Sequence, residues 1–154
     1  MPTEADWDSY ARAVVDITPP DRGRFRIVPD EPGVTDRWPD GLEPPIVVVT
    51  AWNPDSIALP PGDNQARNQL LVAELDRLGV THWPAVGRDL GTPYFEEGFA
   101  VAGFTEAQGV DLGARHGQAA VYVWTPEAWS VVPCVEGRRH TAGWRLDDQP
   151  PSVL

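Results

Sequence analysis

Ile46-Val-Val-Val-Thr-Ala-Trp52 is a short apolar run that predicts a buried β-strand. A proline-containing loop follows it, and residues 63–78 then carry leucines at helical spacing, which predicts a long amphipathic helix. Gly79 stands where that helix is expected to end, because glycine readily takes the left-handed conformation that follows many helices. This strand, loop and helix predict the first half of a mixed α+β unit.

The segments after Gly79 predict the second half of that unit. Three apolar or alternating segments predict strands, at residues 80–86, 98–104 and 118–124. Between the last two, Thr105 and Gln108 form a capping-box pattern that begins a helix over residues 105–116. The resulting order over residues 46–124 is β-α-β-β-α-β, which predicts a ferredoxin-like core in an α+β domain.

Three glycines recur every four residues along the second helix, at Gly109, Gly113 and Gly117. A glycine inside a helix costs about 1 kcal/mol relative to alanine, so this spacing needs a compensating reason. We expect that the missing side chains allow a neighbouring segment to approach the backbone of this helix closely.

Additional elements are expected to extend the core at both ends of the chain. An N-terminal helix capped by Thr3 carries an apolar stripe as far as Val14, and a strand over residues 24–28 follows it. A C-terminal strand over residues 129–135 is expected to form a hairpin with the strand before it. Both added strands would widen the sheet of the core.

The composition fits a single globular domain. The 154 residues are 42% hydrophobic, and no apolar run is long enough to cross a membrane. We expect residues 1–145 to form the domain and residues 146–154 to form a loose tail. The net charge of −11 disfavours binding to nucleic acid, whose phosphates it repels. A single cysteine and the lack of a secretory signal are compatible with the cytoplasm.

The first turns of the helix over residues 63–78 carry polar side chains on its apolar face. Asn64, Arg67 and Asn68 share that face with the leucines. Polar groups that face a protein interior must find partners, and the end of the preceding strand supplies Asn53. These four residues predict a polar cleft. The N-terminus of the helix and the guanidinium group of Arg67 favour an anionic ligand there.

Further residues are candidates for the walls and the chemistry of this cleft. Glu96 and Glu97 are adjacent, so in a strand they point to opposite faces, and one of them reaches the cleft as a candidate general base. Gln118 precedes a strand and is placed either to orient a ligand or to bond a backbone group at the strand end. Trp52 and Trp124 end strands and are expected to wall the cleft.

No metal site or cofactor is predicted. His82, His116 and His140 are scattered, and the chain has no H-x-x-x-H, HExxH or CxxC spacing. It also lacks the glycine-rich motifs that bind phosphates or dinucleotides. Cys134 lies in an apolar segment, so we expect it to pack in the core rather than act as a nucleophile.

Four short segments have a distinctive combination. They are Thr50-Ala-Trp-Asn-Pro54, Asn64-x-x-Arg-Asn68, Glu96-Glu97-Gly98-Phe99 and Gly117-Gln118. Together they resemble the bacterial family catalogued as domain of unknown function 3293, over roughly residues 45–125. Ala119 departs from that family, which tends to carry an asparagine after the glutamine. The resemblance implies a small soluble bacterial protein and implies no activity.

Two functional interpretations remain open. In the first, the protein binds a small polar or anionic molecule in the cleft, with or without metal-free acid–base chemistry by Glu96 or Glu97. In the second, it is a non-catalytic protein–protein interaction module, and the polar cluster only pins the loop over residues 54–62. A homodimer formed through the sheet is compatible with both interpretations.

Overall fold

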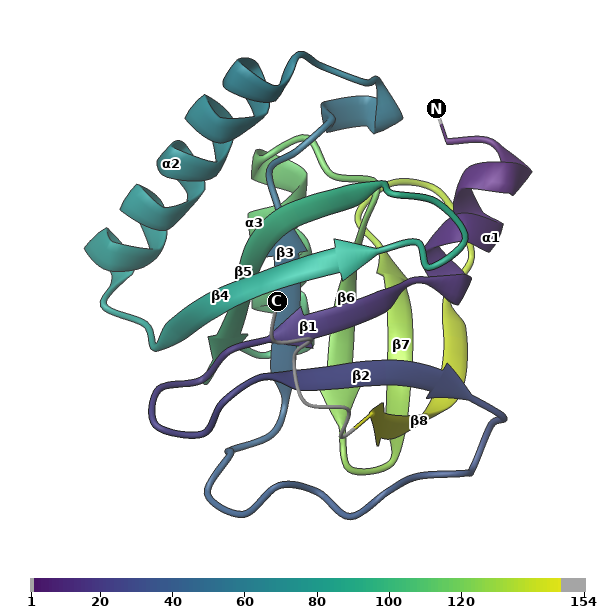
Figure 1. Ribbon diagram of the computed structural model, residues 1–154. Coiled ribbons are helices and arrows are strands. Elements are labelled where there is room, and N and C mark those ends of the chain that lie inside the picture. The colour runs from purple at the N-terminus through teal and green to yellow at the C-terminus, as the bar shows by residue number, and fades with distance from the viewer. Residues whose placement is uncertain (1, 148–154) are drawn as a thin grey trace.

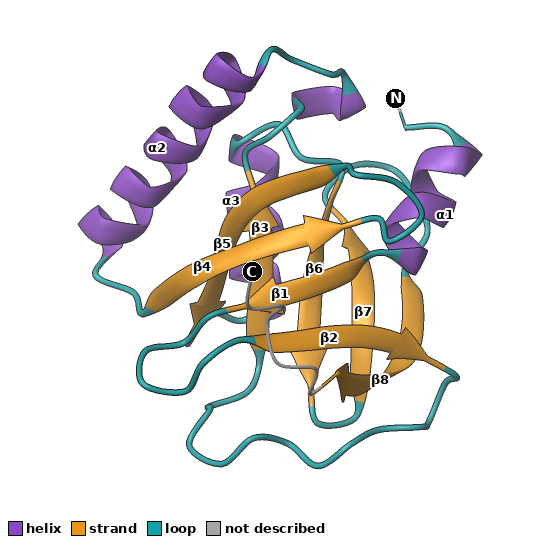
Figure 2. Cartoon of the chain, in the orientation of Figure 1, coloured by secondary structure: helices purple, strands orange, loops and turns teal. Residues whose placement is uncertain are grey.

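The structure, a computed structural model, describes residues 2–147, and within them eight antiparallel strands close into a barrel (Figure 1). Around the barrel the strand order is β1-β2-β8-β7-β6-β3-β5-β4, and β4 pairs with β1 to complete the circle. The strands are β1 (Val14–Ile17), β2 (Phe25–Asp30), β3 (Ile46–Thr50), β4 (His82–Arg88), β5 (Phe95–Ala102), β6 (Ala120–Thr125), β7 (Ala128–Pro133) and β8 (His140–Asp147). Figure 2 shows the helices outside this barrel: α1 (Glu4–Arg12), α2 (Pro61–Leu78), α3 (Glu106–Arg115) and a short 3₁₀ turn, η1 (Pro54–Ser56).

The closed barrel contradicts the predicted ferredoxin-like α+β sandwich. The elements β3, α2, β4, β5, α3 and β6 follow one another along the chain, but their strands do not remain an open sheet. Instead, β4 pairs with β1 and β6 pairs with β7, while β2 and β8 pair with each other and complete the wall. Four strands outside the predicted unit therefore close the sheet into a barrel.

β1 closes the barrel, and it begins at a residue that the sequence pattern assigns to the end of a helix. The helical stripe includes Val14, but α1 ends at Arg12 and Val14 begins β1. All four residues of β1 are buried, including Asp16. Asp16 accepts hydrogen bonds from Arg26 in β2 (Nε to Oδ1, 2.8 Å) and from Arg88 in β4 (Nε to Oδ2, 2.9 Å). A charged residue whose partners are on two other strands interrupts the apolar pattern by which a strand is recognised.

β8 is the second strand that the sequence pattern does not predict. It pairs with β2 and β7, and it includes Leu146 and Asp147 from the segment predicted as a tail. The rest of that segment, residues 148–154, lies outside the described residues. Each described strand pairs with a neighbour on both sides, so the barrel lacks the open edge that dimerisation through the sheet requires. A homodimer stays a prediction.

Side chains inside the barrel form one core, and side chains beneath the helices form a second. Along β3, Ile46 and Val48 belong to the inner core, whereas Val47 and Val49 belong to the outer core with residues of α2 and α3. β3 is therefore buried on both faces. This double burial explains why its sequence is an unbroken apolar run rather than an alternating one.

Indole side chains fill one end of the barrel. Trp124 from β6, Trp129 from β7 and Trp144 from β8 are at most 1% exposed. Trp38, from the loop between β2 and β3, packs on Trp124 with ring centroids 4.3 Å apart and donates from Nε1 to the carbonyl oxygen of Leu42 (2.7 Å). Trp124 thus belongs to the barrel core and not to the wall of a cleft, where its place at a strand end led us to expect it.

α2 and α3 cover the outer side of the barrel over β3, β5 and β6 (Figure 1). Leu71 of α2 and Leu112 of α3 are fully buried there. The predicted capping box of Thr105 and Gln108 is confirmed, and so is the helix end at Gly79, which has φ 69°. Every helix within residues 2–147 is too short or too polar to cross a membrane.

Two glycines of α3 provide the close approach that their spacing predicts. A Cβ atom on Gly109 would lie 2.7 Å from Cγ1 of Val47, and one on Gly113 would lie 2.7 Å from Cγ1 of Val121. Carbon atoms in contact prefer about 3.5–4.0 Å, so neither position has room for a methyl group. The prediction is confirmed at these two positions, and α3 packs directly on β3 and β6.

Replacing Gly109 by alanine tests this packing. We expect Gly109→Ala to lower the free energy of unfolding by about 1–3 kcal/mol, because the new methyl group overfills the contact with Val47. Gly62→Ala in α2 is the control: no atom lies within 4 Å of its Cβ position, so it should raise the free energy of unfolding by up to about 1 kcal/mol. Urea denaturation measures both values, and equal stability of the two variants would contradict the close approach.

Candidate functional site

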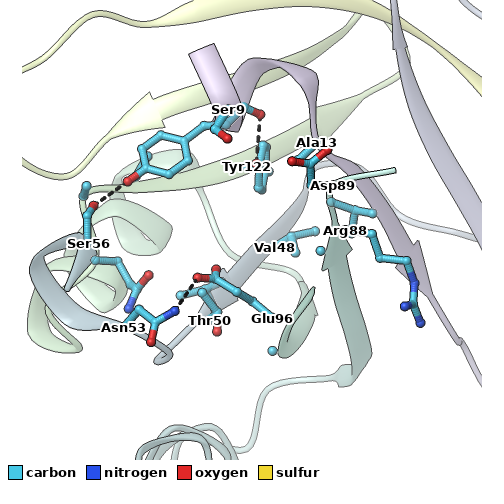
Figure 3. A pocket seen from close by; sticks show the side chains of 18 of the residues that line it. Ser9, Ala13, Val48, Thr50, Asn53, Ser56, Arg88, Asp89, Glu96 and Tyr122 are labelled. Carbon is cyan, nitrogen blue, oxygen red and sulfur yellow. Dashed lines mark hydrogen bonds between the residues drawn. The ribbon is translucent and has the colours of Figure 1, made fainter. Parts of the chain in front are cut away.

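The barrel holds a cavity of about 290 Å³, seen from close by in Figure 3, and this cavity lies at the end away from the indole core. β6 shows the division, because Ala120 at its start lines the cavity and Trp124 near its end lies among the indoles. The lining includes Tyr10 from α1, Val15 from β1, Val48 from β3, Ala85 and Gly87 from β4, Glu96 from β5, Tyr122 from β6, Ser56 from η1, and Asn53, Tyr94 and Gln118 from loops. Most of the wall surface is apolar, although many of the lining residues also carry a polar group.

Glu96 places a carboxylate in this cavity. Its Oε1 accepts hydrogen bonds from the hydroxyl of Tyr94 (2.5 Å) and from Nδ2 of Asn53 (3.3 Å). Its Oε2 makes no hydrogen bond to any described residue. Burial raises the pKa of Glu96 above its ordinary value, and the hydrogen bonds from Tyr94 and Asn53 offset only part of this rise. The site therefore holds a partly desolvated carboxylate with one unused oxygen.

Asn53 is held in one orientation by α2. Its backbone N–H donates to Oδ1 of Asn64 (2.9 Å), and its Oδ1 accepts from Nδ2 of Asn64 (2.8 Å) and from the backbone N–H of Leu59 (3.0 Å). Both partners of Oδ1 are donors, so the amide nitrogen faces the other way, toward Tyr94 (2.7 Å to the hydroxyl oxygen) and Glu96. Asn53 has φ 46° and ψ 59°, a left-handed conformation that asparagine tolerates. Asn64 thus directs Asn53 into the site.

Three tyrosines line the cavity together with Glu96. The hydroxyl of Tyr10 shares a hydrogen bond with Oγ of Ser56 (2.6 Å), and the hydroxyl of Tyr122 donates to the carbonyl oxygen of Tyr10 (2.9 Å; Figure 3). Burial raises the pKa of Tyr10, Tyr94 and Tyr122, and the negative charge of Glu96 raises all three further. The phenols therefore stay protonated at neutral pH and act as neutral hydrogen-bonding groups.

The ionic groups of the lining are mostly acidic. Asp6, Asp89 and Glu96 carry carboxylates, and Arg88 is the basic residue that the described lining contains. The guanidinium group of Arg88 is already bonded to Asp16 (Nε to Oδ2, 2.9 Å), and Figure 3 shows it directed away from Glu96. The cavity is therefore better suited to a neutral or cationic ligand than to an anion.

Three of the predicted site residues, Asn53, Glu96 and Gln118, line the cavity. Gln118 is buried, and its Nε2 donates to the carbonyl oxygens of Trp52 (3.0 Å) and His116 (3.3 Å). Gln118 therefore bonds backbone groups, which is one of its two predicted roles. These contacts also orient the amide, so that Oε1 of Gln118 is left without a hydrogen bond to any described residue.

The remaining predicted residues do not line the cavity; they are Trp52, Asn64, Arg67, Asn68 and Glu97. α2 lies outside the barrel, so its polar side chains face the adjoining loop or solvent: Asn64 bonds Asn53, Arg67 is exposed, and Asn68 is half-buried. Oδ1 of Asn68 is buried without a hydrogen-bond partner among the described residues. Contact of these helix residues with a ligand stays a prediction, and the cavity offers no support for it.

Trp52 and Glu97 lie beside the site but face away from it. Trp52 is buried against Phe95, with ring centroids 5.5 Å apart. Glu97 is exposed, while its neighbour Glu96 lines the cavity, as the alternation of a strand predicts. Of the two candidate bases, Glu96 is therefore the one placed at the cavity.

Four residues of the site are not predicted from the sequence: Tyr10, Ser56, Tyr94 and Tyr122. For Tyr94 a signal exists, because it directly precedes β5 and lies two residues before Glu96, the spacing at which residues of an extended chain share a face. Tyr122 alternates with outward-facing valines and so belongs to the inner face of its strand. Tyr10 and Ser56 reach the site only through the closed tertiary structure, and no local pattern marks them.

Within the described chain, no three His, Cys, Asp or Glu side chains are grouped so that they could hold a metal ion. His116 bonds Glu74 (2.9 Å), away from the cavity. Cys134 packs against the outer core, as predicted, and burial raises the pKa of its thiol to about 11. At neutral pH this cysteine is therefore a poor nucleophile.

Residues 49–121 match the model of a family described as a protein of unknown function, DUF3293. The match confirms the resemblance that the four sequence segments indicate. It includes Asn53, Tyr94, Glu96 and Gln118 from the cavity lining, while Tyr10 from the same lining lies outside it. No curated protein and no solved structure matches the chain.

The raised pKa of Glu96 predicts a pH-dependent cost to stability. The folded state holds the proton on Glu96 more tightly than the unfolded state, in which the pKa of this side chain has its ordinary value of 4.5. The contribution of this group to stability is therefore fully present below pH 4.5 and is lost as the pH rises through the folded-state pKa. Glu96→Gln cannot ionise, so it avoids this loss of stability at high pH, and its side-chain carbonyl oxygen can still accept the hydrogen bond from Tyr94.

We expect the Tm of Glu96→Gln to exceed that of the wild type at pH 8, and the difference to vanish toward pH 4. Each 1 kcal/mol corresponds to about 2–4 °C for a chain of this size. Glu97→Gln, at the exposed neighbouring position, is the control and should show no such pH-dependent difference. Thermal melts across this pH range measure the effect. A wild type as stable as Glu96→Gln at pH 8 would count against the burial of this carboxylate.

Proposed function

We propose that this protein binds a small polar molecule in the barrel cavity, with Glu96 as the central contact. The observation that carries the proposal is the unused Oε2 of Glu96 beside a cavity of about 290 Å³. Removing a carboxylate from water costs free energy, and groups with perturbed pKa values in cavities are concentrated at functional sites. Apolar walls with a few converging polar groups are also the usual composition of a small-molecule site.

The proposal keeps the polar ligand that the sequence predicts but not the anionic one. The anionic ligand depended on Arg67 and on the N-terminus of α2, which do not line the cavity. The lining instead carries Asp6, Asp89 and Glu96, whose charges repel an anion.

Acid–base catalysis by Glu96 is a second candidate function, and its raised pKa favours it. A carboxyl group whose pKa moves toward neutrality becomes a better general base and a better general acid at cellular pH. Tyr94 and Asn53 hold Oε1, so Oε2 is the atom available to exchange a proton with a substrate. This chemistry needs no metal and requires the same bound molecule as the first proposal.

The alternative is a non-catalytic protein–protein interaction module. In that case the bonds between Asn53 and Asn64 serve only to pin the loop over residues 54–62. In either case we propose that the protein acts in the cytoplasm, a compartment with which the single, reduced Cys134 is compatible. The two functions differ in whether a small molecule binds in the cavity.

Filling the cavity from Gly87 separates these functions. Gly87 pairs with Glu96 across β4 and β5 and lines the cavity, and no atom lies within 4 Å of its Cβ position. We expect Gly87→Val to abolish the thermal shift that a bound metabolite gives the wild type. Its own Tm should be unchanged or higher, because a β-branched residue suits a strand better than glycine does.

The measurement is a thermal-shift screen of the wild type against a metabolite library at pH 7.5, repeated with Gly87→Val. Gly62→Ala, which lies outside the cavity, is the control and should keep every response. A response that survives in Gly87→Val arises elsewhere on the protein and would contradict the proposed site. A library without any response would favour the interaction module.

A further inference from the structure

We infer that the molecule bound in this cavity is a small amine whose protonated nitrogen contacts Oε2 of Glu96. This inference deepens the small-molecule function proposed above and rests on it. It follows from which hydrogen-bonding groups of the lining are already used and which are free.

Most donors of the lining are already bonded to protein atoms. The amide nitrogens of Asn53 and Gln118 donate to neighbouring oxygens at 2.7–3.3 Å. The hydroxyls of Tyr94 and Tyr122 also donate within the protein, at 2.5 Å and 2.9 Å. A ligand that needs several donors from the protein would have to displace these bonds.

Acceptors of Glu96 and Gln118, in contrast, are unused. Oε2 of Glu96 and Oε1 of Gln118 make no hydrogen bond to any described residue, although both residues line the cavity and Gln118 is only 8% exposed. Unused acceptors require a ligand that donates. An ammonium group carries three donors and no acceptor, whereas an ionised carboxylate or phosphate only accepts and would leave both oxygens unpaired.

The charges of the lining favour the same ligand. Asp6, Asp89 and Glu96 are acidic, whereas Nε of Arg88 is bonded to Asp16 (2.9 Å) and the guanidinium group of Arg88 points away from Glu96 (Figure 3). A protonated amine therefore meets complementary groups in this cavity.

The apolar walls define the rest of the ligand. Val15, Val48 and Ala85 offer contacts to a hydrocarbon group, and the cavity of about 290 Å³ has room for a small one beside the ammonium group. Burial raises the pKa of Glu96, and a neighbouring ammonium group would lower it again because it stabilises the ionised form. Amine binding should therefore weaken as the pH falls and Glu96 becomes protonated.

A panel of matched compounds tests the inference. Butyl, hexyl, phenylethyl and indolylethyl groups are each joined to an amine, an alcohol and a carboxylate, and isothermal titration calorimetry at pH 7.5 measures the Kd of each compound. We expect at least one amine to bind the wild type about 10–100-fold more tightly than the alcohol with the same hydrocarbon group, which is the effect of a charge-assisted hydrogen bond. The carboxylates should bind more weakly than the alcohols.

Two variants assign this preference to one carboxylate. Glu96→Gln should reduce the affinity for the amine to that for the matched alcohol, whereas Glu97→Gln, on the exposed face of the same strand, should keep the wild-type preference. Equal binding of amines and alcohols by the wild type, or a preference that persists in Glu96→Gln, overturns the inference and leaves the cavity function standing. Absence of binding by all of these compounds, together with a metabolite screen without a response, overturns both.

Discussion

Closure of the barrel depends on β1, the four-residue strand that pairs with β2 on one side and with β4 on the other. Val15 and Ile17 of this strand face the inner core, and Asp16 is fixed by arginines from both neighbouring strands. Burial alone would raise the pKa of Asp16, but the hydrogen bonds from Arg26 and Arg88 outweigh it and lower the pKa. Ionic contacts therefore stabilise one face of the seam, which is the junction of β1 with β2 and β4. Apolar packing stabilises its other face. The cavity has a wall at Val15 only because this seam is closed.

The two ends of the barrel differ in their packing. Tightly packed indoles fill one end, while the other end keeps a cavity, a partly desolvated carboxylate and a loop in an unfavourable conformation. In that loop Asn53, Asp55 and Ser56 all have positive φ, at 46°, 59° and 61°. Non-glycine residues in this region cost on the order of 1–3 kcal/mol each and are concentrated at functional sites. The strained loop and the partly desolvated carboxylate thus lie at the same end of the barrel, and this coincidence supports the cavity as the functional end.

Local sequence rules predict the elements of this protein better than their assembly. The strand at Ile46, the helix end at Gly79 and the capping box at Thr105 depend on neighbouring residues, and all three are present. Closure depends on pairs such as Val15 with Gly87, which lie far apart in the sequence and have no local signal. One overlooked signal is the double burial of β3, since an apolar run without alternation implies cover on both faces of the sheet.

The polar face of α2 shows why the sequence locates the neighbourhood of the site but not its wall. Asn64 does not line the cavity, yet its amide bonds both the backbone and the side chain of Asn53 and so turns the amide nitrogen of Asn53 toward Glu96. That hydrogen bond lowers the pKa of Glu96 against the larger, opposing effect of burial. A residue of the outer helix therefore influences the charge of a carboxylate that it does not touch. Asn64 is a positioning residue: its buried amide bonds Asn53, and Asn53 in turn bonds Glu96 in the cavity.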